Sequence, residues 1–73
     1  MIVKYYFTFG GDHKLAGYCQ PIEAQDYYAA RAKMFELYRA KWGFQYLEGD
    51  WLKIKNDPKR KWPLEQELPT IEA

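Results

Sequence analysis

The segment of residues 26–42 has the spacing of an amphipathic helix, and no other segment restricts the fold as strongly. Asp26 has the short acceptor side chain that caps a helix N-terminus, and Gly43 is placed to end the helix in a left-handed conformation. The spacing therefore predicts a helix of about four turns. At 100° per residue, one apolar arc of this helix contains Tyr27, Ala30, Met34, Phe35, Leu37, Tyr38 and Trp42.

Arg31 falls inside this apolar arc, where its charge needs a partner. A guanidinium framed by Tyr27, Tyr38 and Trp42 can stack on the rings and bind an anionic ligand or a partner's carboxylate. Alternatively, the stem lies along the helix and the head group pairs within the chain, which makes Arg31 structural. The second interpretation is the favoured one. Its candidate partners are Glu23, Glu48 and the acidic residues of the C-terminal arm, Glu65, Glu67 and Glu72.

Extended segments lie on both sides of this helix. Residues 2–9 alternate apolar and polar side chains at the strand period of two, and residues 18–24 form a second extended run. The loop between them begins with two glycines and an aspartate, so we expect a hairpin. Residues 44–47 predict a short third strand, with Phe44 and Tyr46 on one face.

The order of these elements predicts their arrangement. A single crossover helix joins the second and third strands, so these two should run parallel, with the first strand between them. This order also leaves Pro21, which lacks a backbone N–H, on an edge strand. Residues 51–57 predict a short second helix that Pro58 stops, and the following residues read as an extended arm over the sheet or helix. The arm's expected anchors are Trp62, Leu64, Leu68 and Ile71.

We therefore predict one α+β domain over residues 1–73, with a core in residues 1–50 and the short helix and C-terminal arm in residues 51–73. Its sheet has three strands in the order strand-strand-helix-strand, with the main helix packed on it. A chain this short buries only about 60% of its unfolded surface, so its three Trp, seven Tyr and four Phe serve first as core. Some rings are nevertheless expected at the surface. The predicted core is Tyr5, Phe7, Phe9, Ile22, Met34, Leu37, Tyr38 and Phe44.

Composition excludes several classes of function. The net charge of +1 gives no global field toward nucleic acid or membrane, and no apolar run approaches the roughly 20 residues of a membrane span. The single Cys19 and the absence of a signal peptide indicate a cytoplasmic protein. One histidine and one cysteine are too few for a protein-only zinc site. We expect no cofactor and no enzymatic activity.

Two segments carry candidate binding chemistry. Residues 10–14 combine two glycines with Asp12, His13 and Lys14, which can hold a small anionic ligand, but a polar hairpin loop whose glycines permit positive φ is the commoner use. Residues 51–62 carry cations flanked by indoles. The cations can bind the phosphate groups of a nucleic acid, and the indoles can stack on its bases. Nearby carboxylates largely cancel this charge, so a solvated basic turn is the alternative. The candidate residues are Trp51, Lys53, Lys55, Lys59, Arg60, Lys61 and Trp62.

The pattern across residues 4–51 resembles a group of small proteins encoded by bacteriophages and mobile elements of Gram-positive bacteria. The runs that carry the resemblance are residues 4–10, the loop with His13 and Leu15, and residues 22–24, 30–38 and 41–46. The group has no assigned activity, so no functional residue is carried over. The resemblance implies a context in which tiny accessory proteins bind and block host machinery, including restriction and CRISPR defence nucleases.

These observations predict a non-enzymatic binding protein, a phage or mobile-element accessory factor that binds and inhibits a host protein such as a defence nuclease. The first alternative is a nucleic-acid-binding module that uses residues 51–62. The second alternative is a sponge for, or an enzyme acting on, a small anionic ligand near residues 10–14.

Overall fold

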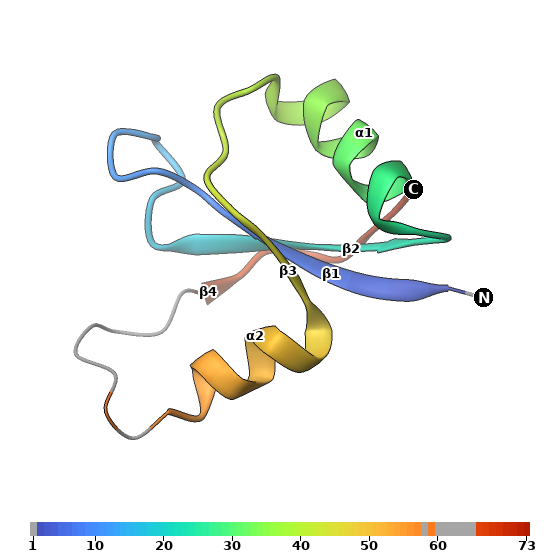
Figure 1. Ribbon diagram of the computed structural model, residues 1–73. Helices are drawn as coiled ribbons and strands as arrows, with labels where there is room; N and C mark the ends of the chain where they lie inside the picture. Colours follow the sequence, from blue (N-terminus) through green and yellow to red (C-terminus); the bar gives the residue numbers. More distant parts are fainter. Residues whose placement is uncertain (1, 58, 60–65) are drawn as a thin grey trace.

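A computed structural model describes residues 2–57, 59 and 66–73 of the chain. The helices lie on opposite faces of one sheet (Figure 1), which gives three layers. The expected α+β class, with one main helix and a shorter second helix, is confirmed. In chain order the elements are β1 (Val3–Thr8), β2 (Tyr18–Ala24), α1 (Tyr27–Tyr38), β3 (Gln45–Leu47), α2 (Glu48–Lys55), β4 (Gln66–Glu67) and β5 (Ile71–Glu72).

The first strand lies at the centre of the sheet, as the sequence predicts. β1 pairs antiparallel with β2 on one side and with β3 on the other, in the order β3-β1-β2. The hairpin of β1 and β2 places Tyr5 opposite Ile22 and Phe7 opposite Gln20. Since β2 and β3 both run antiparallel to β1, they run parallel to each other, which confirms the expected direction of the crossover.

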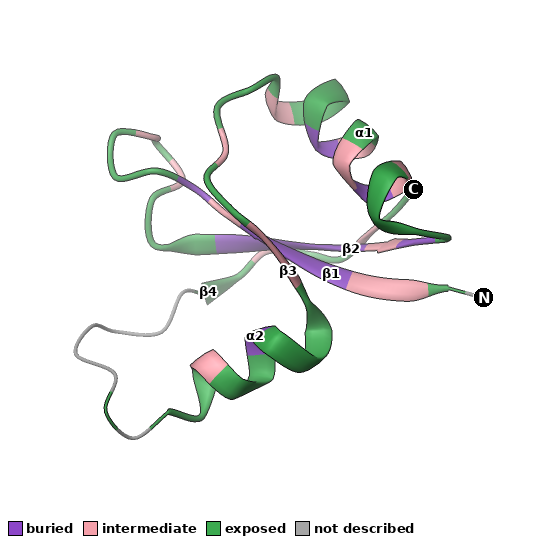
Figure 2. Cartoon of the chain, viewed as in Figure 1, coloured by how far each residue is buried: buried purple, intermediate pink, exposed green. Residues whose placement is uncertain are grey.

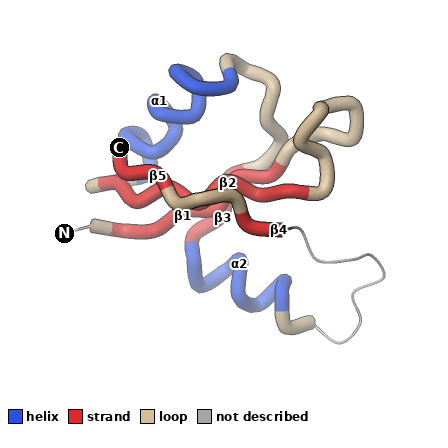
Figure 3. Tube along the Cα trace, turned by 180° about the vertical axis from the view of Figure 1, so that it is seen from behind, coloured by secondary structure: helices blue, strands red, loops and turns tan. Residues whose placement is uncertain are grey.

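The expected three-stranded sheet and the arm lying over it are wrong, because the described sheet has five strands. The C-terminal segment contributes β4 and β5, which both pair parallel with β2 along its outer side (Figure 3). Each is only two residues long, too short for any periodic pattern to reveal it. The expected anchors Leu68 and Ile71 do pack against the core, whereas Trp62 and Leu64 lie outside the described residues.

Because β4 and β5 cover it, β2 is not the edge strand that Pro21 was expected to require. β4 pairs with the first two residues of β2 and β5 pairs with residues 22 and 23, so Gln20 and Pro21 lie opposite the gap. Pro21, which has no backbone N–H, thus lies at a position of β2 that pairs with neither β4 nor β5. The buried Gln20 side chain bridges the gap instead, since its Nε2 donates to the Pro69 carbonyl at 2.7 Å.

The main core fills the space between the sheet and α1. Ala30 and Met34 of α1 are buried against alternate residues of β1 and β2 (Figure 2). The predicted core is wrong for two residues, Leu37 and Phe44. Leu37 is 43% exposed and Phe44 is 68% exposed, because the helix turns Leu37 away from the sheet and Phe44 lies before β3 begins. The buried members are Tyr5, Phe7, Phe9, Ile22, Ala24, Ala30 and Met34, and Tyr38 packs against them partly buried.

A second, smaller core lies between the opposite face of the sheet and α2. Tyr6 is buried on this face and stacks on Trp51 of α2, with ring centroids 5.5 Å apart and an interplanar angle of 12°. Cys19 completes the buried cluster, and Tyr46 packs at its side. The opposite face of the sheet is therefore covered by α2. With both faces covered, β1 buries three consecutive residues, as strands inside layered sheets do.

The main helix is shorter than predicted, and Gly43 does not end it. Asp26 caps the N-terminus as expected, with its Oδ1 accepting from the Ala29 N–H at 2.8 Å. The helix ends at Tyr38. The next residue, Arg39, has the positive φ, 60°, that was expected at Gly43. Gly43 instead approaches β1 closely, donating its N–H to the Thr8 carbonyl at 2.7 Å. A Cβ on Gly43 would lie 3.4 Å from Thr8 Oγ1, which is an ordinary van der Waals distance, so the backbone hydrogen bond and not a steric need for glycine holds this residue beside β1.

Removing the Tyr38 hydroxyl should destabilise the fold in a pH-dependent way. This hydroxyl donates to Gln20 Oε1 at 2.9 Å, and burial raises the pKa of Tyr38. Tyr38→Phe leaves a buried acceptor unpaired, so we expect a loss of about 1–2 kcal/mol at neutral pH. A raised pKa in the folded state means that this stability is present below about pH 10 and is lost as pH rises further. Urea unfolding of parent and variant should be measured at neutral pH and above about pH 10. The difference between their free energies of unfolding should be smaller at the higher pH. A difference that stays constant would contradict this.

Candidate functional site

An open groove lies between α1 and the connection that follows it. We call it the arginine groove. It combines one charged side chain with four aromatic side chains, and its volume is about 370 Å³. Its walls come from α1, from the connection of residues 39–44, and from the first residue of β3. The lining residues are Tyr27, Arg31, Phe35, Ala40, Trp42, Gly43, Phe44 and Gln45.

Arg31 is held in this groove by rings, and the expected pairing with a carboxylate of the chain is not present in the part that the structure describes. Its guanidinium carbon lies 4.8 Å from the Trp42 ring centroid and 5.6 Å from that of Phe35. A long hydrogen bond of 3.4 Å joins Nη1 to the hydroxyl of Tyr27 one turn earlier. The ion pairs among the described residues are Lys33 with Glu36 and Lys55 with Glu67, and neither includes Arg31.

The early end of α1 explains this geometry. Since Trp42 lies in the connection and not on the helix, its indole folds back between α1 and the sheet. It packs edge-on against Phe7 with centroids 5.1 Å apart and against Phe35 at 5.5 Å. Arg31 lies over the ring of this indole, and such a cation–π contact is worth about 0.5–1 kcal/mol at an exposed site.

Two buried polar atoms among the residues that line the groove have no hydrogen-bond partner in the described structure. They are Trp42 Nε1, a donor, and Gln45 Oε1, an acceptor. The other end of the Gln45 amide donates from Nε2 to the Tyr27 carbonyl at 3.1 Å. Unsatisfied buried groups are rare in folded proteins and often occur where water or a ligand completes the site.

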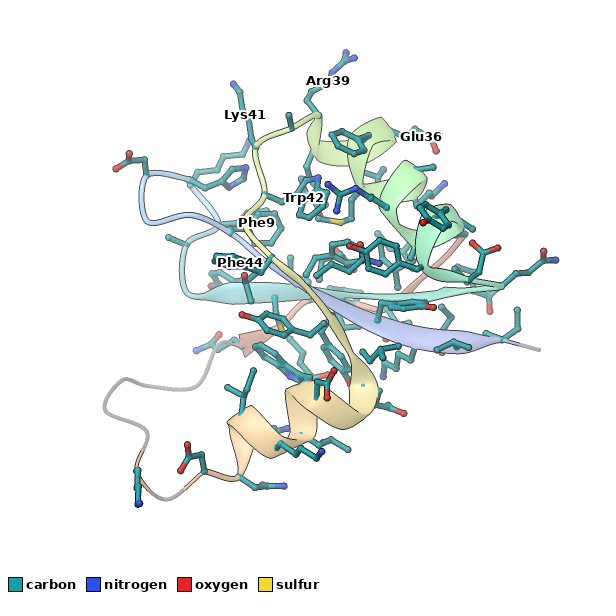
Figure 4. All side chains as sticks on the ribbon, viewed as in Figure 1. Phe9, Glu36, Arg39, Lys41, Trp42 and Phe44 are labelled. Atoms are coloured by element: carbon teal, nitrogen blue, oxygen red, sulfur yellow. The ribbon has the colours of Figure 1, made fainter. Side chains whose placement is uncertain are left out.

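The rim of the groove exposes large apolar side chains. Phe44 is 68% exposed, and Tyr27 and Phe35 are each 42% exposed. Figure 4 shows Phe44 and Trp42 on the connection between α1 and β3, with Phe44 nearer the sheet. Exposed apolar patches rimmed by polar groups mark interaction sites, and this cluster provides the surface rings expected from composition.

The candidate binding residues of segment 51–62 that the structure describes have different surroundings and do not act as one surface. Trp51 is 3% exposed and stacked on Tyr6, so it belongs to the smaller core and is not available to stack on a base. Lys55 pairs with Glu67 of β4 at 3.6 Å, while Lys53 and Lys59 are exposed. The remaining candidates, Arg60, Lys61 and Trp62, lie outside the described residues. The described residues therefore do not combine cations with an accessible indole in this segment.

The loop of residues 10–14 is ordered around its histidine. The His13 ring packs on Phe9 with centroids 4.7 Å apart, and its Nδ1 accepts from the Leu15 N–H at 3.0 Å. The expectation that the loop's glycines serve positive φ angles is wrong for Gly10 and Gly11, because Gly17 is the glycine with positive φ in the described chain. These contacts give His13 a structural role in the loop.

Residues 2–57, 59 and 66–73 contain neither a metal-binding cluster nor a membrane-spanning helix. This part of the chain holds no group of three or more His, Cys, Asp or Glu side chains arranged to bind a metal ion. None of its helices has the length and apolar character needed to cross a membrane.

Comparison of the chain with protein-family models, with curated proteins and with solved structures found no match.

Sequence reasoning identified Arg31, Tyr27 and Trp42 as neighbours but missed the other half of the groove. Tyr38, the third expected ring, lies instead against Phe9 with centroids 5.0 Å apart. Phe44 was assigned to the core, and the part played by Gln45 was not foreseen. The signal that could have found them is the short distance in sequence between Trp42 and β3, which forces the intervening residues to pass beside Arg31.

Proposed function

We propose that this protein is a non-enzymatic binding protein and that the arginine groove recognises an acidic segment of a protein partner. The observation that supports this most strongly is the guanidinium of Arg31. It lies over Trp42 beside exposed rings, and no ion pair of the described chain includes it. The charge is thus positioned by its surroundings and still has its planar N–H donors available for a carboxylate.

A partner's carboxylate would gain more at this site than at an ordinary surface arginine. Arginine binds a carboxylate through two parallel hydrogen bonds, and such charge-assisted pairs are about twice as strong as neutral ones. The rings around Arg31 limit its conformations, so less side-chain entropy is lost when the pair forms. Tryptophan, tyrosine and arginine are also the residue types that most often dominate binding energy at protein interfaces.

The exposed Phe44 indicates that the partner is a macromolecule. A small anion would contact Arg31 and leave Phe44 in water, whereas a protein segment with an apolar residue next to Asp or Glu would cover both. A stable interface covers roughly 800 Å² on each partner, so the contact would extend beyond the groove over the outer side of α1.

The partner in this proposal is a host protein, and binding inhibits it. The resemblance of residues 4–51 to small proteins of bacteriophages and mobile elements supports this context, in which a defence nuclease is a natural target. A groove that binds an acidic surface can block a site without any chemistry of its own.

Comparative affinity capture tests the proposal. Tagged parent protein, Arg31→Met and Phe44→Ala are each incubated with lysate of a Gram-positive host, and the retained proteins are identified. We expect both variants to lose a protein that the parent retains. Leu52→Ala is the control, because Leu52 is 44% exposed on α2, which lies on the opposite face of the sheet from the groove. This control should retain the partner.

Melting temperatures distinguish loss of recognition from loss of folding. Phe44→Ala should melt near the parent, and Arg31→Met should fall by at most about 4–8 °C, since only a surface cation–π contact is lost. A much larger fall for Arg31→Met would make Arg31 structural. Retention of the same protein by every variant would remove the groove from the interface. If the retained material were nucleic acid, and its binding weakened steeply with salt, the nucleic-acid alternative would replace this proposal.

A further inference from the structure

We propose that a second hollow, which shares Ala40 and Trp42 with the arginine groove, binds the phosphate group of a small phosphate monoester. This basic cleft lies between the loop of residues 10–14 and the connection after α1, two segments that are distant in sequence. It comprises two adjoining hollows of about 500 Å³ each. Its lining residues are Gly10, Gly11, Asp12, His13, Lys14, Leu37, Tyr38, Arg39, Ala40, Lys41 and Trp42.

The charges of the basic cleft favour an anion with more than one negative charge. Lys14 comes from the loop, and Arg39 and Lys41 come from the connection, which gives three cations against the single carboxylate of Asp12. Neither ion pair of the described chain includes any of these three cations. Figure 4 shows Arg39 and Lys41 extending outward from the same short connection, so both long side chains are free to fold over a bound group. A phosphate monoester, which carries about −1.5 to −2 charges at pH 7, matches this excess.

The two glycines of the loop have no role in the fold that requires glycine. A Cβ added to Gly10 or Gly11 would meet no atom within 4 Å, and neither residue has a positive φ. Glycine in such a place costs conformational entropy without relieving a clash. A close approach of the backbone to a ligand is the remaining use of glycine that the geometry permits.

The loop also presents backbone donors in a fixed shape. The His13 N–H donates to the Gly10 carbonyl at 3.0 Å, which closes a turn, and the ring of His13 anchors this turn on Phe9. Within the described structure, the N–H groups of Gly11 and Asp12 donate to no protein acceptor. Consecutive free N–H groups in a turn form the kind of concavity that binds phosphate oxygens. Leu37 and Tyr38 add an apolar surface next to it, suited to the organic part of a monoester.

Titration followed by nuclear magnetic resonance tests this inference. The folded chain is titrated at low salt with inorganic phosphate and, separately, with adenosine monophosphate as a representative monoester. We expect saturable shifts of the Gly11 and Asp12 amide signals. Tighter binding of the nucleotide would assign the site to monoesters, whereas equal binding would assign it to free phosphate.

Three variants make the result specific. The double variant Lys14→Gln with Lys41→Gln should bind about tenfold more weakly or worse, because charge-assisted hydrogen bonds are lost. Gly11→Ala should bind similarly weakly while melting at or above the parent temperature, because its backbone accepts alanine. Lys53→Gln, an exposed lysine of α2, is the control and should bind as the parent does.

The proposal is overturned if the shifts do not saturate, if Lys53→Gln weakens binding as much as the double variant, or if either Gly11→Ala or the double variant keeps the parent's affinity. Arg31→Met should leave phosphate binding unchanged. A failure of the basic cleft would therefore be distinct from a failure of the arginine groove.

Discussion

Replacing Trp51 by alanine is expected to destabilise the protein by about 3–5 kcal/mol. The indole is 3% exposed and stacks on Tyr6, and it is the buried residue of α2 in the described structure. Without it, α2 loses the ring that stacks on Tyr6, and the smaller core that Trp51 forms with Tyr6 and Cys19 opens to water. A chain of this size has roughly 4–11 kcal/mol of stability in total, so the loss is a large part of it.

Equilibrium unfolding in urea, followed by far-ultraviolet circular dichroism, measures this effect. Leu52→Ala on the same helix is the control, because Leu52 is 44% exposed and should cost less than about 1 kcal/mol. If Trp51→Ala were as stable as Leu52→Ala, α2 would not be held on the sheet by the indole. Trp51 would then return to the candidate binding residues.

Phe7→Ala is expected to cost a similar amount, about 3–5 kcal/mol, on the opposite face of the sheet. Phe7 is fully buried in the central strand, and its ring meets Trp42 edge-on at 5.1 Å. Truncation therefore leaves a cavity between β1, α1 and the connection. Because Trp42 forms one face of the arginine groove, the variant should also loosen the contact of Arg31 with the indole.

The matched control for Phe7→Ala is Leu37→Ala. Both side chains were expected to lie in one core, but Leu37 is 43% exposed, so its truncation should cost less than about 1 kcal/mol. Urea unfolding of the two variants compares these costs directly. Equal losses of stability would mean that Leu37 is buried and that the face of α1 assigned to the core is wrong.

The parts of the fold that the sequence predicted are those with a long repeating pattern. Alternation over residues 2–9 identified the central strand, and Asp26 with the helical spacing after it identified the start of α1. Chain connectivity then determined the strand order and direction. These inferences succeeded because each depends on several residues that act together.

The parts that were missed depend on contacts between segments distant in sequence. β4 and β5 form because the free side of β2 offers hydrogen bonds, which no local pattern in two residues can indicate. α1 ends at Tyr38, and Trp42 packs against Phe7 of β1, a contact between distant segments that the helical spacing does not indicate. The covering of Tyr6 by Trp51 likewise required the sheet to be assembled first.

The candidate site shows the same division. Arg31 stood out because a charge interrupts a row of apolar positions, and that pattern is visible in the sequence. The surroundings of Arg31 could not be predicted in the same way, because Trp42 reaches it from the connection and because Glu67, one of the carboxylates expected to pair with it, pairs with Lys55 instead.

The six residues 39–44, which belong to no helix or strand, contribute to both proposed binding surfaces. Trp42 packs against Phe7 in the core, and the Gly43 N–H donates to the Thr8 carbonyl of β1, so these two residues hold the connection in place. Arg39, Lys41 and Phe44 project from it. Trp42 cannot vary without a loss of stability, because its ring packs against Phe7, whereas the projecting side chains can vary. Natural variation or design could therefore change what the protein recognises by altering three side chains, leaving both cores as they are. In this respect the connection is organised like the variable loop of a binding scaffold, anchored at fixed points and free between them.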